Sequence, residues 1–176
     1  SEFVLVHGQD DPGRSLPALR SFTRYGSGEF AIRPFLERDP GPTLAVMLEW
    51  TADHNEHVRR LASEGCRPRL PWAPALPAFK ADPEPILPIL EALRDDPSEY
   101  VRRSVANNLN DISKDHPDRV LEIAERWIGH SEQTDRIVKH ACRTLLKAGD
   151  PRAMRVFGFA DPGRLAVEEL TLEPST

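Results

Sequence analysis

Apolar side chains recur at helical spacing over most of the chain, and period-two alternation is not convincing anywhere before residue 161. Turns rich in proline, glycine and aspartate separate the periodic segments. The pattern predicts an all-α fold, with helices over residues 15–25, 29–39, 43–52, 55–66, 84–94, 98–116, 117–129, 131–149 and 151–160. Ser15 and Ser98 stand where helix caps are expected.

The segment 101–117, VRRSVANNLNDISKDHP, separates into two faces when it is placed on a helix. Its apolar face predicts contact with a core and consists of Val101, Val105, Leu109 and Ile112. The polar residues gather on the opposite side, and they are Arg103, Asn107, Asn110, Asp111 and Lys114. Glu and Lys have better helix propensity than Asn and Asp, so a merely solvated face would favour them. The polar face therefore indicates a need for short, hydrogen-bonding side chains.

A repeat organises the helices. The pattern D-x4-V-R-R occurs at residues 53–60 and again at 96–103, with a weaker third copy at 138–141. A spacing of about 40 residues is typical of HEAT-like helix pairs. Such pairs stack into a solenoid whose second helices line a concave surface. We expect N-terminal helices of the solenoid in 1–40, repeats carrying the site in 41–160, and a linker in 161–176.

The two ends of the chain suggest a piece of a longer protein. Residues 165–172 look more like a strand than a helix and would have no sheet to join, so we expect them to begin a further domain. Ser1 stands where an initiator Met would be. Between the helices, residues 67–83 form a proline-rich excursion with Trp72 at its middle, and its prolines exclude a continuous helix. Loops of this length are often functional.

Composition narrows the class of protein. A hydrophobic fraction of 39% and a charged fraction of 29% are typical of a soluble globular protein. No apolar run is long enough to span a bilayer, no signal peptide is evident, and two cysteines make no disulfide framework. We therefore expect a cytoplasmic protein with no membrane partner. The net charge of −5 opposes binding of nucleic acid by bulk electrostatics, yet cations cluster in 59–69 and 137–156.

Candidate chemistry rests on carboxylates. His54 and His57 are spaced as zinc ligands could be, but no third ligand with suitable spacing follows, so we expect no metal and no cofactor. Glu29, Glu64 and Asp111 would instead face a basic concavity. A carboxylate repels phosphate but stabilises a developing positive charge, such as the one formed when an N-glycosidic bond breaks. It can also orient or deprotonate the attacking water.

Each of these residues also has a purely structural interpretation. Glu29 suits the first turn of a helix, because its charge complements the helix dipole. Glu64 stands four residues after Arg60 and can simply pair with it. Asp111 could bond to neighbouring amides, and Trp72 could anchor its loop rather than face a cationic base.

Three runs of sequence resemble a known family. VRRLASEGCRPRLPW (58–72), VRRSVANNLNDISKDHP (101–117) and WIGHSEQTDRIVKHACRTLLKAG (127–149) are similar to DNA alkylation repair glycosylases of the AlkC/AlkD superfamily, and specifically to the AlkC branch. The resemblance implies a HEAT-like solenoid that holds duplex DNA in its concave face. It also implies excision of positively charged alkylated bases, above all 3-methyladenine, in base-excision repair.

The resemblance assigns roles to residues of this chain. Asp111 and Glu64 would be the catalytic acids with Glu29 as a third, Trp72 would lie at the lesion, and Arg60 would support the site. The expected DNA contacts are Arg103, Lys114, Lys139, Arg143, Lys147, Arg67 and Arg69. The partner would be double-stranded DNA containing alkylated bases, bound by a monomer in the bacterial cytoplasm. Two alternatives remain: a non-catalytic interaction scaffold, and a protein that binds nucleic acid without cutting it.

Overall fold

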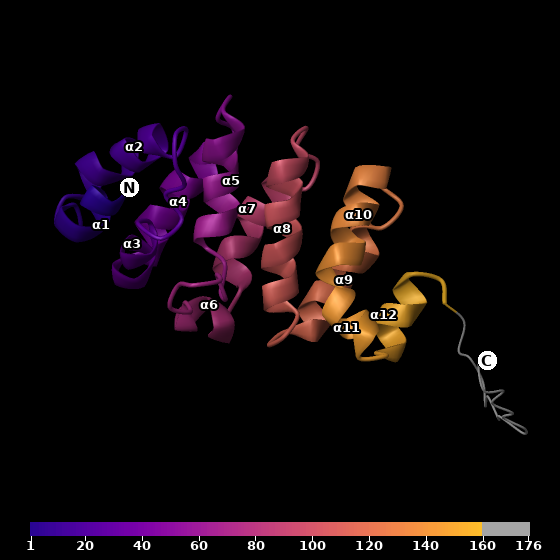
Figure 1. Ribbon diagram of the computed structural model, residues 1–176. Helices are drawn as coiled ribbons and strands as arrows, with labels where there is room; N and C mark the ends of the chain where they lie inside the picture. The colour runs from indigo at the N-terminus through magenta and orange to yellow at the C-terminus, as the bar shows by residue number, and fades with distance from the viewer. Residues whose placement is uncertain (160–176) are drawn as a thin grey trace, which may run out of the picture.

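The computed structural model describes residues 1–159, which form helices joined by short loops (Figure 1). The helices are α1 (Glu2–His7), α2 (Pro12–Phe22), α3 (Arg33–Arg38), α4 (Pro40–Trp50), α5 (Glu56–Gly65), α6 (Pro77–Ala81), the 3-10 helix η1 (Glu84–Ile86), α7 (Leu87–Ala92), α8 (Glu99–Ile112), α9 (Pro117–Trp127), α10 (Glu132–Ala141), α11 (Arg143–Lys147) and α12 (Pro151–Val156).

The helices stack in two layers (Figure 1). Helices α5, α8 and α10 lie side by side in one layer, with α8 packed between the other two. Helices α4, α7 and α9 form the layer behind: α4 and α7 contact α5, and α9 contacts α8 and α10. One continuous apolar core runs between the layers, from Val4 to Ala153. The prediction of an all-α helical-repeat fold is confirmed, since no strand occurs among residues 1–159.

Helix α8 forms as its pattern predicts. Its apolar stripe, Val101, Val105, Leu109 and Ile112, is at most 1% exposed. Burying such side chains contributes about 1.5–3 kcal/mol each, which outweighs the modest helix propensity of the asparagines in the same helix. Packing thus determines that this segment is helical, and the helix in turn carries Asp111 into the interior.

The sequence repeat reappears as a repeat of contacts. Asp53 Oδ1 accepts from the backbone N–H of Asn55 at 2.8 Å, and Asp96 Oδ1 accepts from that of Ser98 at the same distance. The arginine six residues after each aspartate donates to the aspartate's own carbonyl, from Arg59 at 2.9 Å and from Arg102 at 2.5 Å. The first arginine of the motif is therefore structural, and only the second is free to face a site.

The same aspartates connect successive helix pairs. Arg59 donates to both carboxylate oxygens of Asp96, from Nε at 2.6 Å and from Nη2 at 3.0 Å. Arg20 of α2 makes a similar ion pair with Asp53, from Nε at 2.7 Å. Both aspartate side chains are almost fully buried. These ion pairs fix the spacing between neighbouring pairs of helices at the end where α5 and α8 begin.

The predicted N-terminal helix was wrong at its start. Helix α2 begins at Pro12, and its cap is Asp11, whose carboxylate accepts from Arg14 N at 3.1 Å. Ser15 lies inside the helix, and its buried hydroxyl donates to the carbonyl of Gly8 at 2.7 Å. The short helix α1 had no counterpart in the prediction. Six residues are too few for the apolar period to be evident.

Several further boundaries differ from the prediction, among them those of α4, which spans Pro40–Trp50 and not residues 43–52. The segment 29–39 is α-helical only from Arg33, because the residues before it form turns that close on the carbonyl of Gly28. The segment 131–149 is two helices, broken where the Ala141 carbonyl accepts a hydrogen bond from the Asn110 side chain at 2.9 Å. The segment 84–94 begins as a 3-10 turn, and proline at its entry and again at the start of α7 accounts for this.

Two smaller predictions concern loops and ends. Ser98 occupies the cap position of α8, but its hydroxyl donates to Glu56 rather than to the helix. The proline-rich excursion is not wholly irregular, because it contains α6. The strand expected at 165–172 lies outside the described residues. Within the described part of the chain, no helix is both long and apolar enough to cross a membrane.

Candidate active site

Five charged side chains alternate in sign along one line between α5 and α8. Glu29 forms an ion pair with Arg60, which also approaches Glu64 Oε1 at 3.4 Å. Arg67 Nη1 donates to the same Glu64 oxygen at 2.7 Å, and Arg67 Nε donates to Asp111 Oδ2 at 2.9 Å. The three carboxylates predicted from the sequence are thus brought together. Glu29, the least certain of the three, joins the cluster through Arg60.

Local structure explains how these side chains meet. Arg60 and Glu64 are four residues apart on α5 and so share a face of that helix. The chain leaves α5 at Cys66, and Arg67 follows at once with its backbone N–H bonded to the Glu64 carbonyl at 3.2 Å. Asp111 lies on the facing side of α8, which packs directly against α5. Two helices and one tight turn therefore place the whole cluster.

The cluster is deeply buried at one end and more open at the other. The Glu64 and Asp111 side chains are 6% and 4% exposed, whereas those of Glu29 and Arg60 are 17% and 15% exposed. Charges this deep need partners, because an unpaired buried ion is strongly unfavourable. The alternating arrangement supplies a partner for each. Glu29 and Arg60 thus form the more exposed end, and at the other end Asp111 borders the 39% exposed side chain of Lys114.

Two serines add hydrogen bonds that the sequence did not reveal. Ser104 Oγ donates to Glu64 Oε2 at 2.6 Å, and Ser63 Oγ donates to Ser104 Oγ at 2.6 Å. Both serines are buried, one on α8 and one on α5. Glu64 therefore receives hydrogen bonds on both of its oxygens, from Arg67 on one side and from Ser104 on the other. Its carboxylate is held in one orientation.

Arg67 occupies a different place from the one predicted. The sequence suggested a phosphate contact, which requires an accessible guanidinium, but its side chain is only 9% exposed and donates to two carboxylates. Burial alone lowers the pKa of Arg67, but Glu64 and Asp111 outweigh it, so the net pKa is raised. The side chain is a permanent cation within the cluster. Arg67 is buried by partners that are distant in the sequence, such as Asp111. Its local sequence, a basic residue beside a proline, does not indicate this burial.

Lys114 is the more mobile partner of Asp111. Its ammonium lies 3.2 Å from Asp111 Oδ1, one turn along α8, and its side chain is 39% exposed. A long, half-solvated lysine holds such a pair weakly. Lys114 can therefore leave Asp111 for another anion without exposing a buried cation.

The asparagine amides next to Asp111 donate to backbone carbonyls of the neighbouring helices and not to Asp111. Asn108 Nδ2 donates to the Ser63 carbonyl at 2.8 Å, on the α5 side. Asn110 Nδ2 donates to the Ala141 carbonyl at 2.9 Å, on the α10 side. Both are fully buried and join α8 to its two neighbours. The hydrogen bonds to the Asp111 carboxylate come from Arg67 and Lys114 instead.

Trp72 has an unusual backbone and an exposed ring. Its φ is 63°, the only positive value at a non-glycine residue among 1–159, and its side chain is 98% exposed. A bulky residue in this region is strained, and such strain persists only where the surroundings impose it. Buried Arg33 holds the loop from below, donating to the carbonyls of Arg67 at 2.9 Å and Pro74 at 2.5 Å. With 98% of its side chain exposed, Trp72 does not anchor the loop, and its ring is accessible from solvent.

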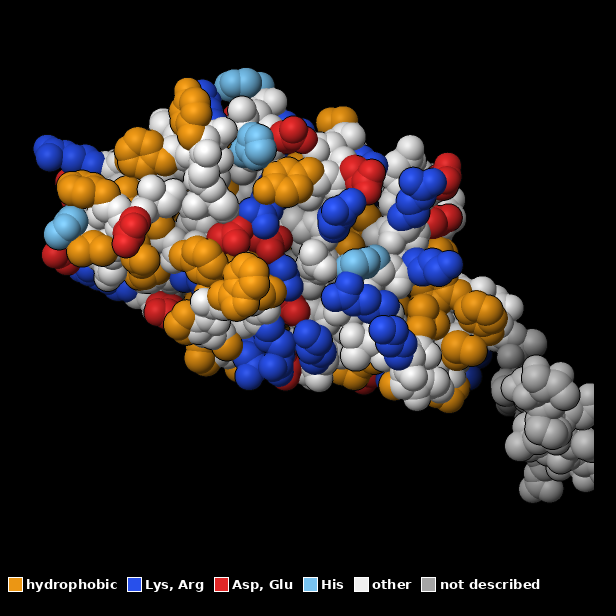
Figure 2. Space-filling model, in the orientation of Figure 1, with side chains coloured by type: hydrophobic (Ala, Val, Ile, Leu, Met, Phe, Trp, Pro, Cys, Tyr) orange, Lys and Arg blue, Asp and Glu red, His pale blue; other side chains and the backbone are white. Residues whose placement is uncertain are grey.

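The remaining predicted DNA contacts lie on the surface. Figure 2 shows Lys and Arg side chains gathered over α8, α10 and α11, next to carboxylates near the centre of the face. Five predicted contacts on or beside these helices are exposed: Arg103, Lys114, Lys139, Arg143 and Lys147. Among the described residues, Arg103 pairs only with exposed Glu99, at 2.8 Å. Arg69 differs, because it makes a two-pronged ion pair with Asp115 at 2.7 and 3.0 Å.

His140 belongs to this basic surface, although the sequence gave it no role. Its Nε2 lies 2.8 Å from Asn107 Oδ1 and 2.6 Å from Arg143 Nη1. Its pKa is lowered, first by burial and then by the positive charges of Arg143, Arg103 and Arg67. A neutral imidazole can accept from Arg143, and it adds no further charge to the surface at neutral pH.

A small aromatic depression of about 170 Å³ adjoins the open end of the cluster. The Arg60 guanidinium lies 5.0 Å from the centre of the Tyr100 ring, and His57 meets that ring edge-on at 5.6 Å. Tyr25 on the opposite rim is 93% exposed. Aromatic faces beside a cation provide a surface on which planar groups can stack.

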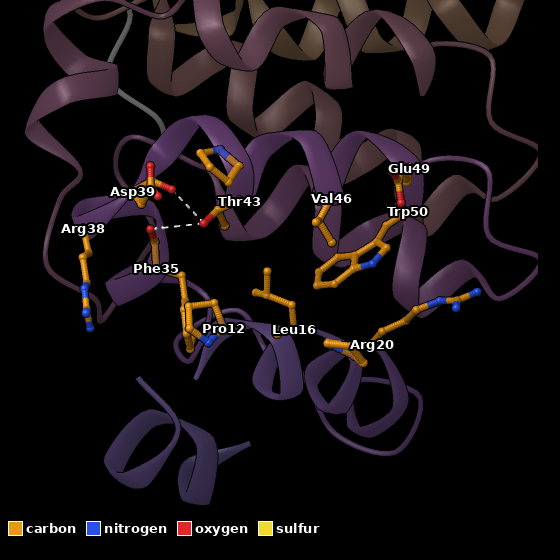
Figure 3. A pocket seen from close by; sticks show the side chains of 13 residues that line it. Pro12, Leu16, Arg20, Phe35, Arg38, Asp39, Thr43, Val46, Glu49 and Trp50 are labelled. Carbon is orange, nitrogen blue, oxygen red and sulfur yellow. Dashed lines mark hydrogen bonds between the residues drawn. The ribbon is translucent and has the colours of Figure 1, made fainter. Parts of the chain in front are cut away.

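A larger groove lies elsewhere. It measures about 520 Å³ between α2 and α4, and its apolar lining includes Leu16, Phe35, Val46 and Trp50 (Figure 3). Figure 3 shows these side chains pointing into the groove from α2, α3 and α4. None of the three clustered carboxylates lines it. In the described part of the chain, no group of three His, Cys, Asp or Glu side chains is arranged to hold a metal ion.

Comparison with known families decides the class. The family model described as DNA alkylation repair enzyme matches residues 27–146, the span that carries the whole charged cluster. The chain belongs to this family. An uncharacterized Bacillus subtilis protein, YhaZ, is 51% identical over 173 residues, which cover 98% of this chain and 47% of YhaZ.

Solved structures of the family share the fold. The Pseudomonas fluorescens alkylpurine DNA glycosylase AlkC, bound to DNA containing an abasic site analog, is 53% identical with a TM-score of 0.85, over 89% of this chain and 44% of AlkC. AlkD2 from Streptococcus mutans is 28% identical with a TM-score of 0.62, over 76% and 67% of the two chains. The chain thus spans about half the length of YhaZ and of AlkC. The predicted resemblance to the AlkC/AlkD superfamily is confirmed.

Proposed function

We propose that this chain carries the active site of a DNA glycosylase that removes positively charged alkylated bases, 3-methyladenine above all. The observation that carries the proposal is the buried line of carboxylates and arginines from Glu29 to Asp111 beside an exposed basic surface. A surface that only held DNA would gain nothing from carboxylates, because they repel phosphate. Membership of the DNA alkylation repair enzyme family and the likeness to AlkC support the same conclusion.

The chemistry is hydrolysis of the N-glycosidic bond. Water adds to the anomeric carbon of the sugar, the base leaves with the bonding electrons and becomes neutral, and one proton of the water is released. The sugar passes through an oxocarbenium-like state whose positive charge a fixed carboxylate stabilises. A base that is already cationic is a good leaving group, so electrostatic help and an oriented water suffice. This mechanism uses no cofactor.

The residues divide the work as follows. Asp111 stabilises the oxocarbenium charge and receives the proton of the attacking water, since its one mobile partner, Lys114, can move to a phosphate. Glu64 and Glu29 extend the negative potential toward the opening, and Arg60 holds those two carboxylates together. Trp72 contacts the lesion with its exposed ring, where a cationic base gains from an aromatic face.

The backbone of the DNA would lie along the exposed cations. Arg103, Lys139, Arg143 and Lys147 belong to helices on one side of the cluster, and Arg69 lies on the other. Contacts of this kind set position and affinity without reading sequence. The binding partner is duplex DNA containing an alkylated base, and one copy of the protein provides all of the proposed contacts.

The test is release of bases from DNA treated with a methylating agent. Chromatography of the released material should show 3-methyladenine with the wild-type protein, and about 100-fold less with Asp111→Asn or Glu64→Gln. Glu132→Gln removes an exposed carboxylate on α10 and should release bases at the wild-type rate.

Other outcomes separate the alternatives. Equal release by wild type and both site variants would refute the assigned mechanism. Tight binding of alkylated DNA without release would favour a protein that recognises damage but does not cut. If neither binding nor release occurs, the interaction scaffold is the better interpretation.

A further inference from the structure

Glu64 and Asp111 pose an electrostatic problem that one residue resolves. Two carboxylates that share a buried site cannot both ionise readily, and one of them normally takes up a proton. Yet both are bonded to the same guanidinium, Glu64 through Nη1 at 2.7 Å and Asp111 through Nε at 2.9 Å. Among residues 1–159, Arg67 is the one side chain that hydrogen-bonds to both. A planar cation between them compensates the two charges and fixes their separation.

Arg67 is itself held rigidly. Its backbone carbonyl accepts from buried Arg33 at 2.9 Å, and its backbone N–H donates to the Glu64 carbonyl at 3.2 Å. The side chain is only 9% exposed, so it cannot reach a phosphate without leaving both carboxylates. Lys114, by contrast, is 39% exposed, and among residues 1–159 its ammonium bonds to Asp111 alone.

We propose that Arg67 is a positioning residue, which keeps Glu64 and Asp111 ionised together at a fixed separation and makes no contact with DNA. The inference rests on the proposed function and adds to it an account of how the two acids remain charged in a buried site. Asp111 can act on the sugar only as a carboxylate, so loss of the Arg67 cation beside it should lower the rate of base release most at low pH.

Other charged groups surround the pair and must be kept in place in any test. They belong to α3, α5, α10 and to the segments before α3 and after α5 and α8, and they are Glu29, Arg33, Arg60, Arg69, Lys114 and His140. Of these, Lys114 remains beside Asp111 when Arg67 is removed, and Arg60 remains beside Glu64. Loss of Arg67 should therefore raise the protonation pH of the acids without fully neutralising them.

The experiment compares Arg67→Met, Arg67→Lys and Arg143→Met by single-turnover base release from pH 4.5 to 8. Arg67→Met should lower the rate at pH 6 at least about tenfold and move the acidic limb of the profile up by about 1 pH unit or more. Arg67→Lys retains the positive charge, so it should show a smaller loss of rate and a smaller shift of the acidic limb than Arg67→Met. Affinity for DNA, and its dependence on salt, should stay at wild-type values in both.

Arg143→Met is the matched control, since Arg143 is an exposed cation on the basic surface. It should weaken DNA binding and reduce the salt slope by about 1, with the acidic limb unchanged. If Arg67→Met behaves like this control instead, Arg67 is a phosphate contact and the proposal fails. A wild-type rate and profile for Arg67→Met would overturn it equally.

A titration that needs no activity completes the test. Carbon NMR of the Glu64 and Asp111 carboxyls, in the wild-type protein and in Arg67→Lys, measures protonation directly. At least one carboxyl should protonate at higher pH in the variant, and unchanged midpoints would contradict the proposal. If base release is absent from every protein, the proposed function fails, while the titration still tests the electrostatic role of Arg67. Should Arg67→Met not fold, Arg67→Lys carries both measurements.

Discussion

Replacing Asp96 by Ala should destabilise the stack more than any exposed ion-pair substitution. Asp96 is 3% exposed in its side chain and accepts three hydrogen bonds: two from Arg59 at 2.6 and 3.0 Å, and one from Ser98 N at 2.8 Å. Removing one partner of a buried pair costs about 3–5 kcal/mol. Arg59 keeps its bonds to the carbonyls of Asp53 and His54 and is 12% exposed, so the lower end of that range applies.

Urea unfolding followed by circular dichroism measures this cost. With a loss of about 3 kcal/mol and an m-value of about 2 kcal/mol/M, the midpoint should fall by roughly 1.5 M. Glu132→Ala removes a pair in which both side chains are more than 70% exposed, Glu132 at 75% and Arg136 at 72%, and should leave the midpoint nearly unchanged. If the two variants shift the midpoint equally, the ion pair does not join α5 to α8 and the contact-level account of the repeat is wrong.

Three further outcomes follow from the structure. In Gly65→Ala the new Cβ would lie 2.5 Å from Ile32 Cγ2, so overpacking should cost about 1–3 kcal/mol and lower Tm by several degrees. Gly26→Ala is the control, because no described atom lies within 4 Å of the added Cβ, and it should not lower Tm in this way. Burial raises the pKa of Cys66 to about 12 and that of Cys142 to about 11. Both thiols should therefore react with a disulfide reagent at pH 8 only as fast as the protein unfolds. Rapid labelling of the native protein would contradict this. Burial and nearby arginines lower the pKa of His140 from 6.5, so the unfolded chain binds the proton more tightly than the folded protein does. The free energy of unfolding should therefore fall as pH drops below about 6.5, and His140→Gln should reduce that loss between pH 7.5 and 5.5. An unchanged pH dependence in the variant would contradict the assignment.

Local sequence was sufficient to predict the fold. The apolar stripe of α8 and the D-x4-V-R-R motif both act over a few residues, and both reappear as buried side chains and repeated hydrogen bonds. The repeat also placed α10 beside α8 as the third inner helix. Helix ends were harder to predict, because Ser15, a residue typical of caps, is bonded inside α2 instead.

Of the charged cluster, the sequence indicated the three acids and Arg60. Carboxylates in a basic, repeated face are visible from spacing, and the structure brings all three together. Their partners are not visible, since Arg67 and Ser104 reach Glu64 and Asp111 across the contact of α5 with α8. Nothing local to Arg67 distinguishes a buried guanidinium from an exposed one.

The asparagines of α8 illustrate the same limit. On a helix, Asn110 points about 100° away from Asp111, and α8 has a packed helix on each flank. Its amide therefore bonds to α10, while that of Asn108 bonds to α5. A helical wheel shows which side of one helix is polar, but it does not show how many neighbouring helices cover that side. It therefore predicted a surface face where the side of α8 is largely buried.

The central claim is that Asp111, ionised within this cluster, accelerates cleavage of the bond between sugar and alkylated base. Single-turnover release of 3-methyladenine from a defined duplex, with protein in excess, tests it most directly. Asp111→Asn should slow the chemical step at least about 100-fold while affinity for DNA containing an abasic site analog changes by less than about threefold. Release by Asp111→Asn at the wild-type rate would contradict the account.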